Sequence, residues 1–204
     1  RDPAELRKLG YNALAIYDTT ALSGVADADI IQNGELRSWV QSHAEHVSQT
    51  IDQAQQAGLD VYLFYDAFVL ARDQVERDEA RLCCRKRPVN LCPASDALLE
   101  LVSQGASAML NRWPQVSGLV LRFGDNDAAR LPYLLGNDLY TPHCPRCSQL
   151  GRADRIVNLI ERFHRLVVEQ HDKRLVVRAW NVRPNGLHDS VELARRVVER
   201  LPGE

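Results

Sequence analysis

Four short runs of almost uninterrupted apolar residues set the fold class of this chain. They are rich in branched and aromatic side chains, and each is followed by a polar stretch and then by an amphipathic helical pattern. This alternation is typical of βα units, whose strands pair in a parallel sheet and are covered on both faces. The sequence therefore predicts an α/β domain with four consecutive parallel strands. The runs cover residues 13–17, 61–65, 119–123 and 175–180.

The helical patterns between these runs carry recognisable start and stop residues. Gly58 ends the longest of them, because glycine readily adopts the left-handed conformation that closes a helix. Ser95 precedes another, as an N-cap that accepts a backbone N–H. The expected order is one helix and then four βα units. Helices are expected over about 3–10, 34–57, 96–112, 152–167 and 190–200.

The segments that follow the first three strands are long for an α/β domain. They cover residues 18–33, 66–94 and 124–151, whereas connections of roughly two to six residues are typical. Ligands bind at the carboxyl ends of parallel strands, because loops can vary there without disturbing the core. A functional site is therefore expected at this edge, and decoration without function is the alternative.

Four βα units can close in two ways. One is an open four-stranded sheet, and the other is half of a TIM-type (β/α)8 barrel, with residues 1–204 as a single partial domain. A barrel wall pairs its strands in chain order, whereas a doubly wound sheet reverses once. Residues 124–127, Gly-Asp-Asn-Asp, match no dinucleotide or phosphate-loop fingerprint. A half barrel would leave two open edges for further C-terminal units or a second copy to cover.

Composition excludes two classes of partner. The chain has 25 Lys and Arg against 27 Asp and Glu, a formal net charge of −2. Its overall charge therefore does not attract nucleic acid or anionic lipid. The most apolar stretch, 61–71, is interrupted by Asp66 and is shorter than the roughly 20 residues that cross a bilayer. We expect neither a nucleic-acid nor a membrane partner.

Charged residues stand at the ends of all four predicted strands. Each follows an apolar residue by two positions, so strand alternation would place all four on one face, at the top of a barrel lumen. Guanidinium forks, carboxylates and a flat indole ring suit a carbohydrate ligand. The alternative is a salt-bridge cluster without a ligand. The charged residues are Asp18, Asp66, Arg122 and Arg178, and Trp180 and Asn181 follow them.

Two carboxylates after the third strand are candidates for catalysis. Glycoside hydrolysis needs one carboxyl group as acid and a second as base or nucleophile. Asp125 or Asp127 could supply the acid. An Asx turn or a calcium site would explain the same acidic run.

The strand segments resemble successive strands of glycoside hydrolase barrels of the α-glucuronidase-like group, with hexosaminidase-like barrels as a related pattern. The resemblance implies the N-terminal half of a (β/α)8 barrel and a carbohydrate substrate, with uronic acid-bearing glycans as candidates. It places a general acid Glu where this chain has Asp125 and Asp127, and its partner carboxylates on later strands, so we expect residues 1–204 to be inactive alone. The segments are 9–14, 58–63, 118–122 and 177–180.

Five cysteines form a second group of candidates. Two of them are spaced C-x2-C, by which two thiolates reach one tetrahedral metal ion, and neighbouring parallel strands bring their loops together. A structural zinc ion is the leading interpretation, while disulfides or free thiols remain alternatives. A zinc-tied domain that binds carbohydrate or regulates without catalysis is the second functional hypothesis. The proposed ligands are Cys84, Cys92, Cys144 and Cys147, with Cys83 as the alternative to Cys84 and His143 in reserve.

Overall fold

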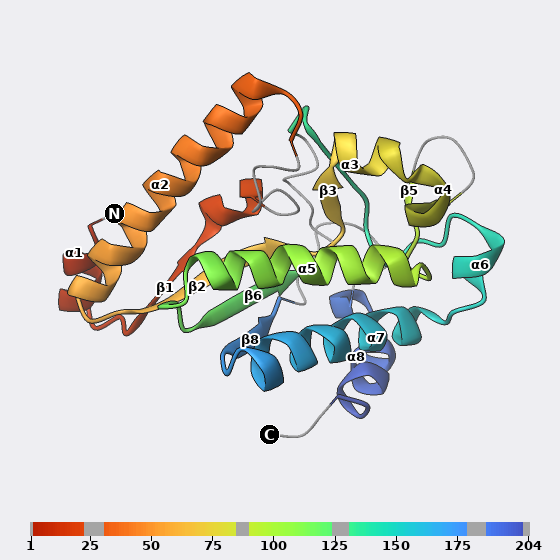
Figure 1. Ribbon diagram of the computed structural model, residues 1–204. Coiled ribbons are helices and arrows are strands. Elements are labelled where there is room, and N and C mark those ends of the chain that lie inside the picture. The colour runs from red at the N-terminus through yellow and green to blue at the C-terminus, as the bar shows by residue number, and fades with distance from the viewer. Residues whose placement is uncertain (1, 23–30, 85–89, 124–130, 179–186, 202–204) are drawn as a thin grey trace.

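A four-stranded parallel sheet forms the centre of the computed structural model, which describes residues 2–22, 31–84, 90–123, 131–178 and 187–201. The strand order β1-β2-β6-β8 follows the chain (Figure 1), which confirms the predicted α/β class and the order of its four strands. The strands are β1 (Ala13–Ile16), β2 (Asp60–Asp66), β6 (Gly118–Arg122) and β8 (Arg174–Val177).

The helices begin and end close to the predicted positions. Ser95 accepts a hydrogen bond from the N–H of Leu98, as an N-cap should, and Gly58 adopts φ 73° just beyond the longest helix. None of the described helices is long and apolar enough to cross a membrane. The main helices are α1 (Pro3–Lys8), α2 (Gly34–Gln56), α5 (Asp96–Arg112), α7 (Arg152–His164), its π-helical continuation η4 (Arg165–Gln170), and α8 (Val191–Val198).

Helices cover one face of the sheet. Tyr65 of β2 is buried there, donates its hydroxyl to the carbonyl of Val102 on α5 at 2.7 Å, and contacts the ring of Phe163 on α7. On the opposite face, among the described residues, Ala15 is exposed and Val176 is 45% exposed. Val120, the register partner of Val176, is buried on this face. The expectation that both faces are covered therefore holds only in part for the described residues.

The long segments after β2 and β6 contain regular structure that the sequence pattern did not indicate. Its strands have only two or three residues, too few for a readable alternation. A short strand of one segment pairs in antiparallel fashion with a short strand of the other, and this pairing links the two segments. The elements are β3 (Val69–Ala71), α3 (Arg72–Arg77), α4 (Glu79–Leu82), β4 (Cys83–Cys84), β5 (Asn90–Leu91), β7 (Leu134–Gly136) and α6 (Pro145–Ser148).

Gly118 begins β6 where the neighbouring backbone leaves no room for a side chain. A Cβ atom there would lie 2.0 Å from the carbonyl oxygen of Arg174 on β8. We expect Gly118→Ala to force these strands apart and to lower the free energy of unfolding by about 3 kcal/mol, measured by chemical denaturation. Gly34→Ala is the control, because its Cβ would meet nothing within 4 Å. Equal stability of the two variants would contradict this packing.

Candidate functional site

Two of the predicted strand-end residues form a buried ion pair at the carboxyl edge of the sheet. Asp66 ends β2, Arg122 ends β6, and they are direct partners in the sheet register. Nε and Nη2 of Arg122 donate to the two carboxylate oxygens of Asp66 at 2.5 and 2.9 Å. The exposed fraction is 0% for Asp66 and 1% for Arg122. This bidentate pairing fixes the plane of the guanidinium.

Two aromatic rings complete the surroundings of Arg122. Its Nη1 donates to the hydroxyl of Tyr17 at 2.9 Å. The guanidinium carbon lies 4.8 Å from the centroid of the Tyr17 ring and 5.9 Å from that of Phe64. Burial opposes the charge, but the hydrogen bonds and the charge of Asp66 outweigh it and raise the pKa of Arg122. Arg122 is therefore a fixed, permanent cation.

Arg178 approaches the same aromatic ring from the neighbouring strand. It directly follows β8, and its backbone N–H donates to the carbonyl of Leu121 at 3.0 Å. Its guanidinium carbon lies 5.9 Å from the centroid of Phe64, and the side chain is partly exposed. The structure thus brings Asp66, Arg122 and Arg178 to one edge of the sheet, with Arg178 the more accessible of the two arginines.

Asp18 does not lie on the face expected for it. The register aligns Ile16 with Leu63 rather than with Phe64, so the residue two positions beyond Ile16 has the opposite parity. The strand also ends at Ile16, and Asp18 is an exposed residue of the 3-10 helix η1 (Tyr17–Leu22). Tyr17 occupies the strand end instead, with its ring 5.4 Å from that of Phe64. Sequence reasoning missed Tyr17 because parity cannot be compared between strands without the register.

Four other candidates lie outside the described residues. Two of them, Asp125 and Asp127, come shortly after the end of β6, and the other two, Trp180 and Asn181, come shortly after β8. Their roles stay predictions.

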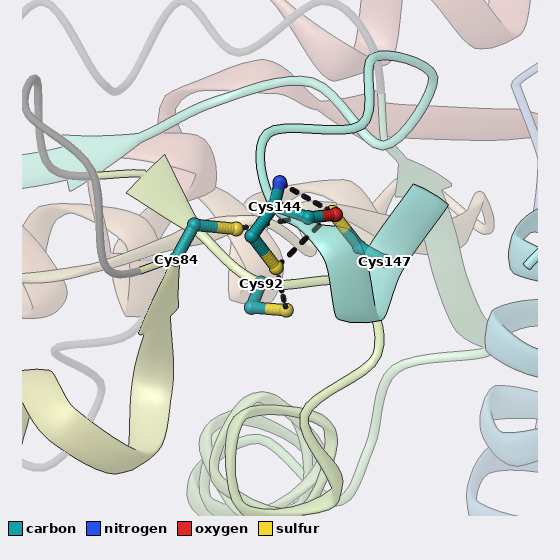
Figure 2. A group of neighbouring side chains, drawn as sticks. All are labelled: Cys84, Cys92, Cys144 and Cys147. Atoms are coloured by element: carbon teal, nitrogen blue, oxygen red, sulfur yellow. Dashed lines mark hydrogen bonds between the residues drawn. The ribbon is translucent and has the colours of Figure 1, made fainter. Parts of the chain in front are cut away.

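A group of four cysteines is formed by residues from the segments after β2 and β6. Cys84 ends β4, and Cys92 follows β5, its antiparallel partner. Cys144 caps the single turn of α6, which contains Cys147. Figure 2 shows the four side chains converging, and their sulfur atoms all lie within 4.8 Å of one another. This confirms the predicted convergence of Cys92, Cys144 and Cys147.

Three of the six sulfur–sulfur distances match those of a tetrahedral metal centre. Sγ of Cys84 lies 3.8 Å from that of Cys147, and Sγ of Cys144 lies 3.8 Å from that of Cys92 and 3.6 Å from that of Cys147. Metal–sulfur bonds of about 2.3 Å give a tetrahedron with sulfur–sulfur edges of about 3.8 Å. A disulfide would need about 2 Å, and all five cysteines are free. The four cysteines could therefore hold a metal ion.

Hydrogen bonds surround two of these sulfurs. The backbone N–H groups of His143 and Cys144 donate to Sγ of Cys147 at 3.1 and 3.2 Å. Burial raises the pKa of Cys144, but hydrogen bonds from Cys147 and from the neighbouring thiols outweigh it and lower this pKa to about 6. Burial raises the pKa of Cys84 and of Cys92. A metal ion would displace the protons that such thiols retain.

Cys83 and His143 stand beside the cysteine centre but outside it. Cys83 packs into the main hydrophobic core, where burial raises its pKa to about 11. Nε2 of His143 is buried without a hydrogen-bond partner among the described residues, yet His143 is not in the four-membered group. The structure thus selects Cys84 rather than Cys83.

Polar contacts tie the cysteine-bearing segments to each other and to the sheet. Oδ1 of Asn137 accepts from the N–H of Leu91 at 2.7 Å, and its Nδ2 donates to the carbonyl of Leu91 at 3.1 Å. The N–H of Leu139 donates to the carbonyl of Phe123 at the end of β6 at 3.1 Å. The cysteine centre is therefore anchored to the edge that carries Arg122.

Comparison with known proteins finds similarity in structure but none in sequence. No family model and no curated protein matches the sequence. A β-galactosidase from the psychrophilic Marinomonas ef1 superposes with a TM-score of 0.54 at 14% identity, over 86% of this chain and 34% of that one. The galactosidase domain of the α-galactosidase-sucrose kinase AgaSK gives a TM-score of 0.51 at 11% identity, over 86% of this chain and 23% of that one. The chain thus spans about a third or less of either protein and shares a fold with part of each glycosidase.

Proposed function

We propose that this chain is a glycoside hydrolase-like domain that acts on or binds a carbohydrate at the carboxyl edge of its sheet. The observation that carries the proposal is the arginine pair around Phe64, with Arg122 locked by Asp66 and Arg178 partly exposed. A buried ion pair is a poor source of stability, because desolvation offsets its attraction. Its position at the ends of two parallel strands suits a ligand site better.

The chemistry of this edge suits a sugar. Tyr17 is 42% exposed and offers an aromatic face to the C–H groups of a pyranose ring. A guanidinium such as that of Arg178 donates to hydroxyl groups and binds a carboxylate in bidentate fashion. A uronic acid-bearing glycan would use both properties, which makes it the finer form of the proposal.

The four βα units fit half of a TIM-type barrel. Sequential pairing of parallel strands is the arrangement of a barrel wall. On the face opposite the helices, Ala15 and Val176 are exposed apolar residues of the described part of the chain, as residues of a lumen face would be in a barrel wall that is not yet closed. The two glycosidases matched above are longer chains, which agrees with further barrel units completing the site.

Catalysis would depend on the acidic run after β6. Asp125 or Asp127 is proposed as the proton donor, and the test replaces each separately by Asn in the full-length parent enzyme. Rates are measured on aryl galactosides, aryl glucuronides and uronic acid-bearing oligosaccharides. One variant should lose about 100-fold or more in turnover, the range for removal of a general acid. Near-normal rates in both variants would overturn this assignment.

Carbohydrate binding without catalysis is the second candidate function. It is favoured by the hydrogen bonding of Asp66, because Arg122 donates to both of its carboxylate oxygens. A carboxylate held in this way is unsuited to proton transfer. Saturable sugar binding without turnover would select this function over the hydrolase.

The metal proposed for the four-cysteine centre is zinc. Zinc prefers tetrahedral coordination by thiolates, and a site with four protein ligands leaves no open position, so its role would be structural. It would clamp the segments after β2 and β6 beside the carbohydrate site.

A further inference from the structure

Arg155 is a buried cation near the cysteine centre. It lies in the first turns of α7, and only 4% of its surface is exposed. Its described hydrogen bonds all run to backbone carbonyls, and no carboxylate pairs with it among the described residues. The positive end of a helix also disfavours a cation. A buried charge in this position needs a compensating negative group nearby.

The hydrogen bonds of Arg155 close the loop that carries the C-x2-C turn. Nε and Nη2 donate to carbonyls that precede the turn, those of Leu139 at 3.1 Å and Tyr140 at 2.6 Å. Nη1 donates to carbonyls at and beyond its end, those of Cys147 at 3.1 Å and Leu150 at 2.5 Å. One planar guanidinium therefore fixes both ends of the segment that presents two of the four thiols.

A metal-loaded cysteine centre would add negative charge beside Arg155, where the carboxylates of Asp138 and Asp154 also contribute. Four thiolates around a divalent ion carry a net charge of −2, since four negative charges meet two positive ones. Burial lowers the pKa of Arg155, and the charge of Cys147 is the largest influence that opposes it. The proximity of Cys92 raises the pKa of Arg146, which lies inside the C-x2-C turn. Two arginines thus stand beside a centre whose net charge would be opposite to theirs.

We propose that Arg155 is a positioning residue of the metal centre, which holds the C-x2-C turn in place and balances the charge of four thiolates around a divalent cation. This inference rests on the metal site proposed above. It predicts that Arg155 affects how tightly the metal is held, beyond any effect on the fold. A residue with a structural role alone would change stability without changing metal release.

The test compares Arg155→Gln, Arg155→Lys and Arg165→Gln. Lys keeps the positive charge but loses the planar guanidinium, and Gln loses the charge. Arg165 serves as the control, because it is an exposed arginine on the continuation of the same helix. Zinc content is measured by elemental analysis, and zinc release by transfer to a chromophoric chelator. Unfolding is measured with and without chelator.

We expect Arg155→Gln to release zinc at least about 10-fold faster than the wild type, the effect typical of residues that support metal ligands. Arg155→Lys should recover part of this loss, and Arg165→Gln should match the wild type. Unchanged release in Arg155→Gln, with zinc still bound by the wild type, would overturn the inference alone. Equal losses in the Lys and Gln variants would overturn the charge-balancing role. A wild-type protein that takes up no zinc would overturn the metal proposal itself, and the inference with it.

Discussion

Cys147→Ser is expected to abolish stoichiometric metal binding. Cys147 is fully buried, its sulfur lies within hydrogen-bond distance of two neighbouring thiols, and it accepts two backbone N–H groups. A structural zinc ion binds with about 10–16 kcal/mol of free energy in small domains, so loss of a ligand removes a large source of stability. Elemental analysis should find about one zinc per wild-type chain and none in the variant, with a much lower thermal unfolding midpoint.

Cys83→Ser is the matched control for this loss. Cys83 adjoins Cys84 in the same hairpin and is also buried, but it lies outside the cysteine centre. The control should keep its zinc, whatever its change in core packing does to stability. Equal zinc content in the two variants would contradict the four-cysteine assignment.

Asp66→Ala is expected to cost about 3–5 kcal/mol of folding free energy, because it leaves the buried guanidinium of Arg122 without its counter-charge. Chemical denaturation measures this loss. The double variant Asp66→Ala/Arg122→Met should recover part of it, since an apolar pair removes the unpaired charge.

Glu100→Ala is the surface control for the buried pair. Glu100 is bonded to Arg162 at 2.9 Å but is 59% exposed, so its removal should cost less than about 1 kcal/mol. A similar small loss in Asp66→Ala would show that Arg122 does not depend on its partner, against the geometry described here.

The spacing of apolar residues along the sequence predicted the strands and helices well, because the buried side of each element must be apolar. Register is a different property, since it depends on how two strands meet in space. Asp18 and Tyr17 show the consequence: the run of residues 13–17 indicated a strand, but not that Tyr17 rather than Asp18 would reach Arg122. The short strands β3 and β7 are stabilised by pairing between distant segments, which no local pattern indicates.

The cysteine centre was predictable in outline because spacing and chemistry limit what thiols can do. The choice between Cys84 and Cys83 depended on the β4–β5 hairpin, which directs one thiol to the centre and the other to the core. The sequence indicated the burial of Arg155 only weakly. Arg155 lies four residues before Leu159 and therefore on the apolar side of its helix. Its backbone partners could be found only in the structure.

Arginine side-chain NMR during a sugar titration tests the carbohydrate site most directly. The Nε–Hε signals of Arg122 and Arg178 are followed as methyl β-galactoside, methyl β-glucuronide or a uronic acid-bearing oligosaccharide is added, with Arg195, paired on the surface with Glu192 and Glu199, as the internal control. We predict saturable shifts at Arg178 and Arg122 with at least one sugar, no shift at Arg195, and loss of binding in Tyr17→Ala. Shifts confined to other parts of the molecule, or none with any of the three sugars, would contradict a carbohydrate site at this edge.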